Sequence, residues 1–173
     1  PDMRYIKTCF NQIFNYLRPN QTLILESTVY PGATKDIFFE RLNKKFNLGK
    51  NFFIGYSPER INPGIKGKIQ YSDTTKVVSG YSSNCKKIVK NFYKLIFKKV
   101  HITKSIEIAE LSKLYENVYR SVNIGLANQI KMITDKMKIN IHDVINASST
   151  KQFGFTKFIP GPGMGGHCIP IDP

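Results

Sequence analysis

The sequence predicts an α/β fold followed by a long helix, and two observations carry this prediction. Over the first hundred residues, short apolar runs alternate with stretches in which apolar side chains recur at helical spacing. One amphipathic pattern then continues without a break from about residue 106 to residue 137. Alternating strands and helices are typical of a parallel sheet, and such sheets bind ligands where their strands end.

The expected elements follow from the local pattern and from its breakers. Pro19 ends the first helix, and Pro31 follows the first strand. Ser105 is suited to cap the long helix, and Glu107 suits the positive end of its dipole. In chain order we expect a helix at 2–17, a strand at 22–29, a helix at 34–46, strands at 52–56 and 76–79, a helix at 82–97, a strand at 100–103, the long helix at 106–137 and a short helix near 142–148.

The composition is that of a globular protein without a disulfide framework. Of the 173 residues, 41% are hydrophobic, which is enough for a buried core. No apolar run is long enough to span a bilayer, and no signal-peptide pattern opens the chain, so we expect no membrane partner and a cytoplasmic location. The three cysteines are an odd number without paired spacing, which argues against disulfides and against a zinc site. We therefore expect no metal.

The net charge of +14 has two interpretations. An excess of lysine and arginine can serve an anionic partner, such as nucleic acid, a membrane surface or a phosphorylated ligand. It can also reflect a lysine-rich surface. Because the lysines are spread along the chain, the second interpretation is favoured. Nucleic-acid binding has no support beyond charge, since no recognition motif for it is present.

Residues 160–173, PGPGMGGHCIPIDP, contain too many glycines and prolines for a helix or an ordinary strand. Cys168 lies in this loop beside His167, with Asp172 four residues further on. This setting predicts a reactive cysteine and covalent catalysis. The glycines also match G-x-G-x-x-G, but a dinucleotide fingerprint needs a strand before it and a helix after it, so we interpret the match as false.

Polar residues at two strand ends and on the long helix are further candidates. Ser27 and Thr28 follow one strand and Glu59 follows another, so all three are expected at one edge of the sheet, unless they are only turn residues. Lys113, Asn117 and Arg120 share one face of the long helix. They suit an anionic oxygen or a sugar, but the spacing alone favours a solvated surface.

Four motifs together resemble the UDP-glucose/GDP-mannose dehydrogenase family, in its UDP-N-acetylglucosamine or UDP-N-acetylmannosamine 6-dehydrogenase branch. They are ESTVYPG at 26–32, YSPERINPG at 56–64, AELSKLYEN at 109–117 and GGHC at 165–168. The resemblance covers nearly the whole chain and implies the second half of a Rossmann-like NAD domain at 1–104. It also implies a central helical domain for dimerisation and catalysis at 105–173, ending in the cysteine loop. The chain thus resembles a fragment. One departure is IKGK at 65–68, where the branch usually has an acidic residue and a basic pair.

The resemblance also implies roles for individual residues. Cys168 matches the nucleophile that holds the sugar aldehyde, and Lys113 the cation that stabilises the oxyanion, with Asn117 as its partner. Glu59 matches the carboxylate of the hydrolysis step, and Asp172 a residue that positions water or the lysine. The residues implied for the cofactor are Ser27, Thr28, Val29, Glu59 and Cys168, with Thr28 also at the catalytic centre. Those for the substrate are Glu59, Arg60, Lys113, Asn117, Arg120, Ile159, Pro160, Gly161, Gly163 and Gly165.

The implied activity is NAD-dependent oxidation of the C6 alcohol of a UDP-(N-acetyl)hexosamine to the uronic acid, through a cysteine thiohemiacetal and thioester, for surface polysaccharide synthesis. The implied partners are a UDP-sugar and a second copy of the chain, paired through the long helix. The alternative is an inactive fragment of such an enzyme that retains only dimerisation.

Overall fold

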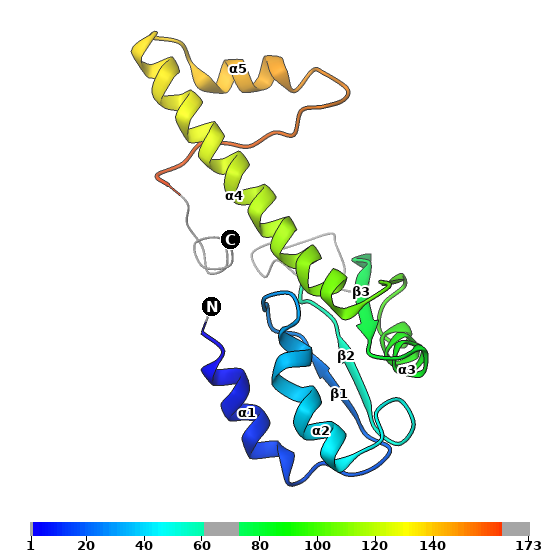
Figure 1. Cartoon of the computed structure of the whole chain (residues 1–173). Coiled ribbons are helices and arrows are strands. Elements are labelled where there is room, and N and C mark those ends of the chain that lie inside the picture. Colours follow the sequence, from blue (N-terminus) through cyan, green and yellow to red (C-terminus); the bar gives the residue numbers. More distant parts are fainter. Residues whose placement is uncertain (1, 61–72, 164–173) are drawn as a thin grey trace. The chain divides into compact units, whose positions relative to one another are not determined.

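The computed structural model describes residues 2–60 and 73–163, which divide into two compact units, 1–114 and 115–173. Figure 1 shows the elements of both. The first unit contains α1 (Arg4–Phe14), β1 (Thr22–Leu25), the π-helical segment η1 (Lys35–Phe39), α2 (Glu40–Lys45), β2 (Phe53–Tyr56), β3 (Lys76–Gly80), α3 (Ser83–Lys94), β4 (Val100–Ile102) and the start of α4 (Ile106–Lys136). The second contains the rest of α4 and α5 (Ile141–Ser148).

The four strands form one sheet in the order β1-β2-β3-β4. β1 pairs with β2 in parallel, and β3 pairs with β4 in parallel. The β2–β3 pair is antiparallel, so the expectation of a wholly parallel sheet is wrong at this pair. An apolar run specifies that a strand is buried but not which way it points, and this is why the sequence did not reveal the reversal. The expected α/β class is confirmed.

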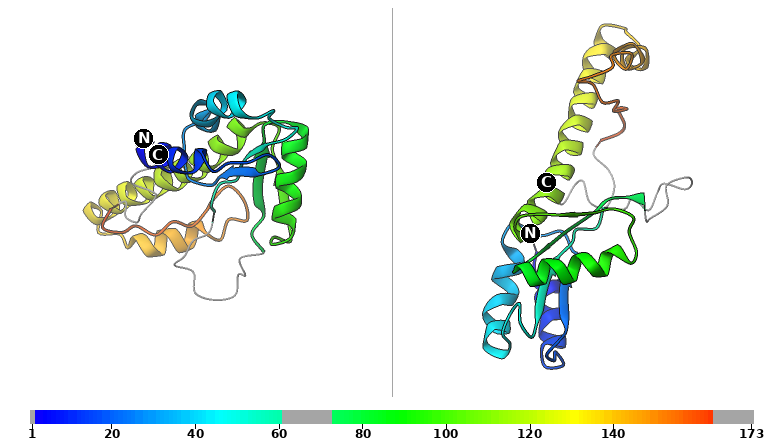
Figure 2. Two further views of the ribbon diagram at one scale, coloured as in Figure 1. Left: turned by 90° about the horizontal axis from the view of Figure 1, so that it is seen from below. Right: turned by 90° about the vertical axis from the view of Figure 1, so that its right-hand side faces the viewer.

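Two hydrophobic clusters hold this sheet. α3 covers one face of the sheet (Figure 2). On this face Val78 of β3 packs with Val89 and Tyr93. The neighbouring residue Val77 belongs to the larger cluster, which includes residues from α1, η1, α2 and the start of α4. Successive strand residues point to opposite faces, so this division of Val77 and Val78 is expected for a sheet covered on both sides.

The glycines of β2 and β3 permit the close packing of α3. A Cβ at Gly80 would lie 2.5 Å from the backbone nitrogen of Lys86, and one at Gly55 would lie 2.5 Å from the side chain of Val89. The first turn of α3 is capped by Ser82, whose hydroxyl accepts from the backbone of Cys85. At Gly80 the sheet therefore approaches the backbone of α3, and only glycine fits there.

In the second unit, α4, α5 and the segment that follows α5 surround a largely apolar cavity. Tyr119 of α4 contacts this segment twice: its ring meets that of Phe158 edge-on at 6.0 Å, and its hydroxyl bonds Thr156 at 3.2 Å. Asn140 caps α5 by accepting from the backbone of His142. Among the described residues, no helix is long and apolar enough to cross a membrane.

Candidate active site

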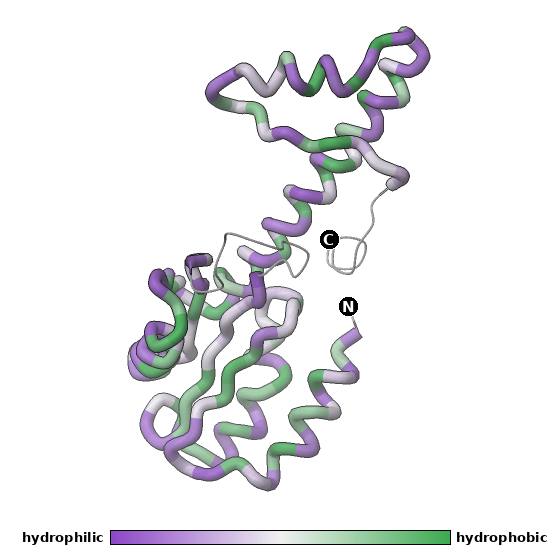
Figure 3. The backbone as a smooth tube through the Cα atoms, turned by 180° about the vertical axis from the view of Figure 1, so that it is seen from behind, coloured by the Kyte–Doolittle hydropathy of each residue, from purple (hydrophilic) through white to green (hydrophobic). Residues whose placement is uncertain are grey.

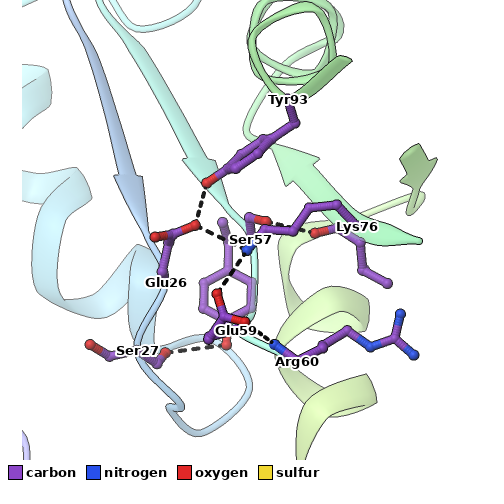
Figure 4. Close-up of polar contacts among 9 residues, drawn as sticks. Glu26, Ser27, Ser57, Glu59, Arg60, Lys76 and Tyr93 are labelled. Carbon is purple, nitrogen blue, oxygen red and sulfur yellow. Dashed lines mark hydrogen bonds and ion pairs between the residues drawn. The ribbon is translucent and has the colours of Figure 1, made fainter. Parts of the chain in front are cut away.

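The carboxyl ends of β1 and β2 lie side by side, as the parallel pairing of Leu25 with Tyr56 requires. The backbone nitrogen of Ser57 donates to the carbonyl of Leu25 at 3.0 Å, and the Tyr56 hydroxyl donates to the carbonyl of Ser27 at 3.2 Å (Figure 4). Ser27 is exposed and Thr28 is half-buried. The expectation that the polar residues after both strands share one edge of the sheet is thereby confirmed.

Glu59 and Arg60 follow β2 at this edge. One carboxylate oxygen of Glu59 accepts from the backbone nitrogen of Arg60 at 2.8 Å. The other lies 3.4 Å from the ammonium of Lys76. The Arg60 guanidinium donates to the carbonyl of Thr75 at 2.8 Å, so one of its functions is to join the loop after β2 to the start of β3.

Sequence reasoning missed Lys76, the first residue of β3. Its side chain is 3% exposed, and its ammonium lies 3.1 Å from Glu26 and 3.4 Å from Glu59. The Tyr93 hydroxyl donates to the same Glu26 oxygen at 2.5 Å (Figure 4). The available signal was a lysine that opens a predicted buried strand, because buried lysines require charged partners.

Sequence reasoning also gave no separate role to Glu110, which is fully buried at the start of α4. One of its oxygens accepts from the backbone nitrogen of Gly32 at 2.6 Å. The other accepts from the backbone nitrogen and the hydroxyl of Thr34, at 2.9 and 2.7 Å. Glu110 thus connects the helix that carries Lys113 to the loop that begins at Ser27.

Three expected site residues lie along α4. Lys113 is half-buried and belongs to the first unit, whereas Asn117 and Arg120 belong to the second. Asn117 is 4% exposed, so the interpretation of this face as a solvated surface is wrong for that residue. Arg120 is exposed, as that interpretation expects.

The expected substrate loop is described only in part. Ile159 is exposed, Pro160 is half-buried, and the backbone nitrogen of Gly161 donates to the Asn128 side chain at 2.9 Å. Gly163 has a φ of +141°, which side chains other than that of glycine rarely adopt. Gly165, Cys168 and Asp172 lie outside the described residues.

Comparison with known proteins decides the family. Residues 1–97 match the model of the NAD-binding domain of the UDP-glucose/GDP-mannose dehydrogenase family, and residues 107–173 match that of its central domain. The chain belongs to this family. Its membership confirms the expected resemblance and, through the NAD-binding domain, the expected cofactor class. The expected boundary between domains at 104/105 stays a prediction.

Individual members of the family agree with this assignment. CapL of Staphylococcus aureus is 42% identical over the whole chain, and a UDP-N-acetyl-D-glucosamine 6-dehydrogenase of Pseudomonas aeruginosa is 39% identical. Among solved structures, the UDP-N-acetyl-mannosamine dehydrogenase Cap5O from Staphylococcus aureus matches 99% of the chain with a TM-score of 0.83 and 32% identity. A UDP-D-ManNAc dehydrogenase from Pyrococcus horikoshii matches 99% with a TM-score of 0.88 and 27% identity. In all four cases the chain spans 41% of the relative's length.

Proposed function

We propose that this chain forms part of an NAD-dependent 6-dehydrogenase. It would oxidise the C6 alcohol of a UDP-(N-acetyl)hexosamine to the uronic acid, for surface polysaccharide synthesis. The observation that carries the proposal is the shared edge of β1 and β2, where Ser27 and Thr28 follow one strand and Glu59 follows the other, in a family that has an NAD-binding domain. Relatives named as dehydrogenases of UDP-N-acetylglucosamine and UDP-N-acetylmannosamine support this substrate class.

The groups at this edge fit the nicotinamide end of NAD. The hydroxyls of Ser27 and Thr28 can bond a carboxamide or a ribose, and Val29, which is 2% exposed, fixes the segment that carries them in the larger hydrophobic cluster. We assign these three residues to cofactor binding, together with Glu59 and Cys168. NAD bound there would accept the hydride in each of two oxidations.

Between the two oxidations, Cys168 would hold the sugar covalently. Its sulfur adds to the C6 aldehyde, and the carbonyl oxygen takes a proton to give a thiohemiacetal. Loss of a hydride from C6 and of the hydroxyl proton to water would then give a thioester. Water attacks the acyl carbon, the C–S bond breaks, and the carboxylate and the free thiol are released. Glu59 would accept the proton of this water, and Asp172 would help to position the water or Lys113.

Residues on α4 and the following loop would bind the substrate. The Lys113 ammonium would stabilise the oxyanion on C6, and Asn117 would hold the same oxygen through a water. The burial of Asn117 supports this role, because a buried amide is held in one orientation. Further contacts to the sugar and its diphosphate are assigned to Glu59, Arg60, Arg120, Ile159, Pro160, Gly161, Gly163 and Gly165.

We also propose a homodimer formed through α4. Along this helix Leu111, Tyr115, Val122 and Leu126 are exposed by 53, 70, 63 and 57%, and Figure 3 shows hydrophobic positions recurring along it. Exposed apolar side chains in such a row favour association. We place the protein in the cytoplasm, where free thiols such as those of Cys9 and Cys85 are stable.

The activity is tested on a completed enzyme, in which the chain replaces its counterpart in the Pseudomonas aeruginosa relative. NADH formation is followed with UDP-N-acetylglucosamine, UDP-N-acetylmannosamine and UDP-glucose. We expect two NADH per N-acetylated sugar, and a loss of at least about a thousandfold in turnover for Cys168→Ser. Failure of the unaltered completed enzyme to reduce NAD with every UDP-sugar contradicts the proposal.

The alternative is an inactive fragment of such an enzyme that retains only dimerisation. Calorimetry of the 173-residue chain with NAD separates the two. Stoichiometric binding of NAD excludes the inactive-fragment alternative. A dimer that shows no heat of binding supports it.

A further inference from the structure

Lys76 is a buried cation at the edge of the sheet that carries the proposed active site. Its side chain is 3% exposed, and its ammonium lies 5.1 and 5.5 Å from the ring centres of Tyr93 and Phe97. Aromatic faces attract a cation but replace only part of the hydration that burial removes. A lysine in this place therefore requires carboxylate partners.

Two carboxylates meet this cation from two different strands. Glu26 follows β1 and lies 3.1 Å from the ammonium; Glu59 follows β2 and lies 3.4 Å from it. Both carboxylate side chains are about half exposed, at 48 and 47%. Each therefore lies at the protein surface with one oxygen turned toward the buried ammonium of Lys76. Lys76 is thus the stationary member of the group, and the carboxylates are the members whose positions it determines.

The Glu26 carboxylate is also held by a contact that does not involve Glu59. The Tyr93 hydroxyl donates to the Glu26 oxygen that faces Lys76, at 2.5 Å (Figure 4). Tyr93 is 5% exposed and packs in the cluster beneath α3. This contact connects the ammonium to the core through Glu26, so Lys76 is held even when Glu59 moves.

The contacts of Glu59 determine the orientation of its carboxylate. One oxygen accepts from the backbone of Arg60 and the other faces Lys76, so the two oxygens are held from different sides. The Arg60 guanidinium bonds the carbonyl of Thr75, the residue before Lys76, which joins the same two segments once more. A carboxylate held at both oxygens has little rotational freedom left.

We propose that Lys76 is a positioning residue for Glu59. The ammonium of Lys76 holds the Glu59 carboxylate at the carboxyl end of β2, in the orientation from which it accepts the proton of the hydrolytic water. This role rests on the proposed function, since it assigns Lys76 to the same reaction. Lys76 acts through Glu59 and does not itself contact the reacting atoms.

The kinetic test uses the completed enzyme with Lys76→Met, a substitution that keeps an unbranched side chain one atom shorter and removes its charge. We expect kcat to fall roughly tenfold to a hundredfold, as misplaced catalytic groups cause, while the KM values for NAD and the UDP-sugar change less than about threefold. Lys76→Arg restores the charge and is expected to recover most of kcat. The matched control is Lys87→Met on α3, an exposed lysine, with kcat within about twofold.

A purely structural role predicts other results. An unchanged kcat in Lys76→Met overturns the proposal, and so does a rise in KM that accounts for the whole loss. If Lys76→Met does not fold, Lys76→Arg and Glu26→Gln replace it. We then expect kcat of Lys76→Arg to stay near that of the unaltered enzyme and kcat of Glu26→Gln to fall; unchanged kcat in Glu26→Gln overturns the proposal.

A second measurement does not depend on activity. In the 173-residue chain, a shielded lysine ammonium gives a resolved, slowly exchanging signal in nitrogen-15 NMR. We expect such a signal from Lys76, absent in Lys76→Arg and shifted in Glu59→Gln. If the Lys76 signal has the same chemical shift in Glu59→Gln, the positioning role is overturned even when the enzyme is active. Inactivity of the unaltered enzyme contradicts only the proposed function.

Discussion

Glu110 shows how one side chain completes a distant part of the fold. The backbone nitrogens at the start of a helical segment have no acceptor within that segment. Those of Gly32 and Thr34 find one in Glu110, 76 residues or more further along the chain. Because a carboxylate also suits the positive end of a helix dipole, its complete burial is compatible with a charge.

We expect Glu110→Ala to destabilise the chain by roughly 3–5 kcal/mol, since two buried N–H groups and the Thr34 hydroxyl lose a charged acceptor. Urea unfolding of the 173-residue chain measures this loss. Glu107→Ala, one turn earlier and exposed, is the matched control and should cost much less. Equal losses for the two variants would show that the Glu110 contacts contribute little.

Within elements, the glycines of the sheet and of α4 have opposite roles. At Gly80 a methyl group would meet the backbone of Cys85 and Lys86 within 2.8 Å, whereas at Gly125 nothing lies within 4 Å. In a helix interior, alanine is favoured over glycine because it loses less backbone entropy. The same substitution should therefore change stability in opposite directions at the two positions.

Gly80→Ala is expected to destabilise the chain by more than about 2 kcal/mol, because α3 has to move away from β3. Gly125→Ala is expected to stabilise it by about 0.5–1 kcal/mol. Thermal unfolding followed by circular dichroism measures both. A neutral Gly80→Ala would contradict the close packing of α3 on the sheet.

The start of α4 responds to pH through Glu107. Its own backbone N–H and then the Ser105 hydroxyl hold the pKa of Glu107 below its ordinary value of 4.5. A carboxyl whose pKa is lower in the folded state stabilises the fold above the unfolded value. That contribution is lost as the pH falls below 4.5 and through the folded pKa.

We therefore expect Glu107→Gln to flatten the fall in melting temperature as the pH drops below 4.5, while it lowers stability slightly at neutral pH. Melting curves at a series of pH values from neutral to about 3 measure the slope. If melting temperature falls with pH along the same slope in the unaltered chain and in Glu107→Gln, the pKa of Glu107 is not lowered by folding.

At the scale of the whole molecule, the proposed homodimer can be tested directly. The exposed apolar row on α4 is expected to be covered by a second copy, so Val122→Lys with Leu126→Lys should convert a dimer into a monomer. Light scattering measures the mass. As a control, Ala147→Lys on α5 adds one such charge at an exposed position and should leave the dimer intact. A monomer before any substitution contradicts the proposed pairing.

Most elements were predictable because hydrophobic spacing reports local structure. The long helix was expected at 106–137 and is found at Ile106–Lys136, and the strand expected at 76–79 is found at Lys76–Gly80. The antiparallel pairing of β2 with β3 was not predictable, since strand direction depends on the path of the chain between strands.

The family was predictable from the four motifs, because they place particular residue types at set spacings. The roles of their residues in the site stay a prediction. The burial of the polar groups and their bonding partners became known from the three-dimensional fold. Lys76 meets Glu59, Tyr93 bonds Glu26 and Glu110 bonds Thr34 across separations of 17, 67 and 76 residues. No local pattern contains such pairs, since they exist only once the sheet and its helices have brought distant segments together.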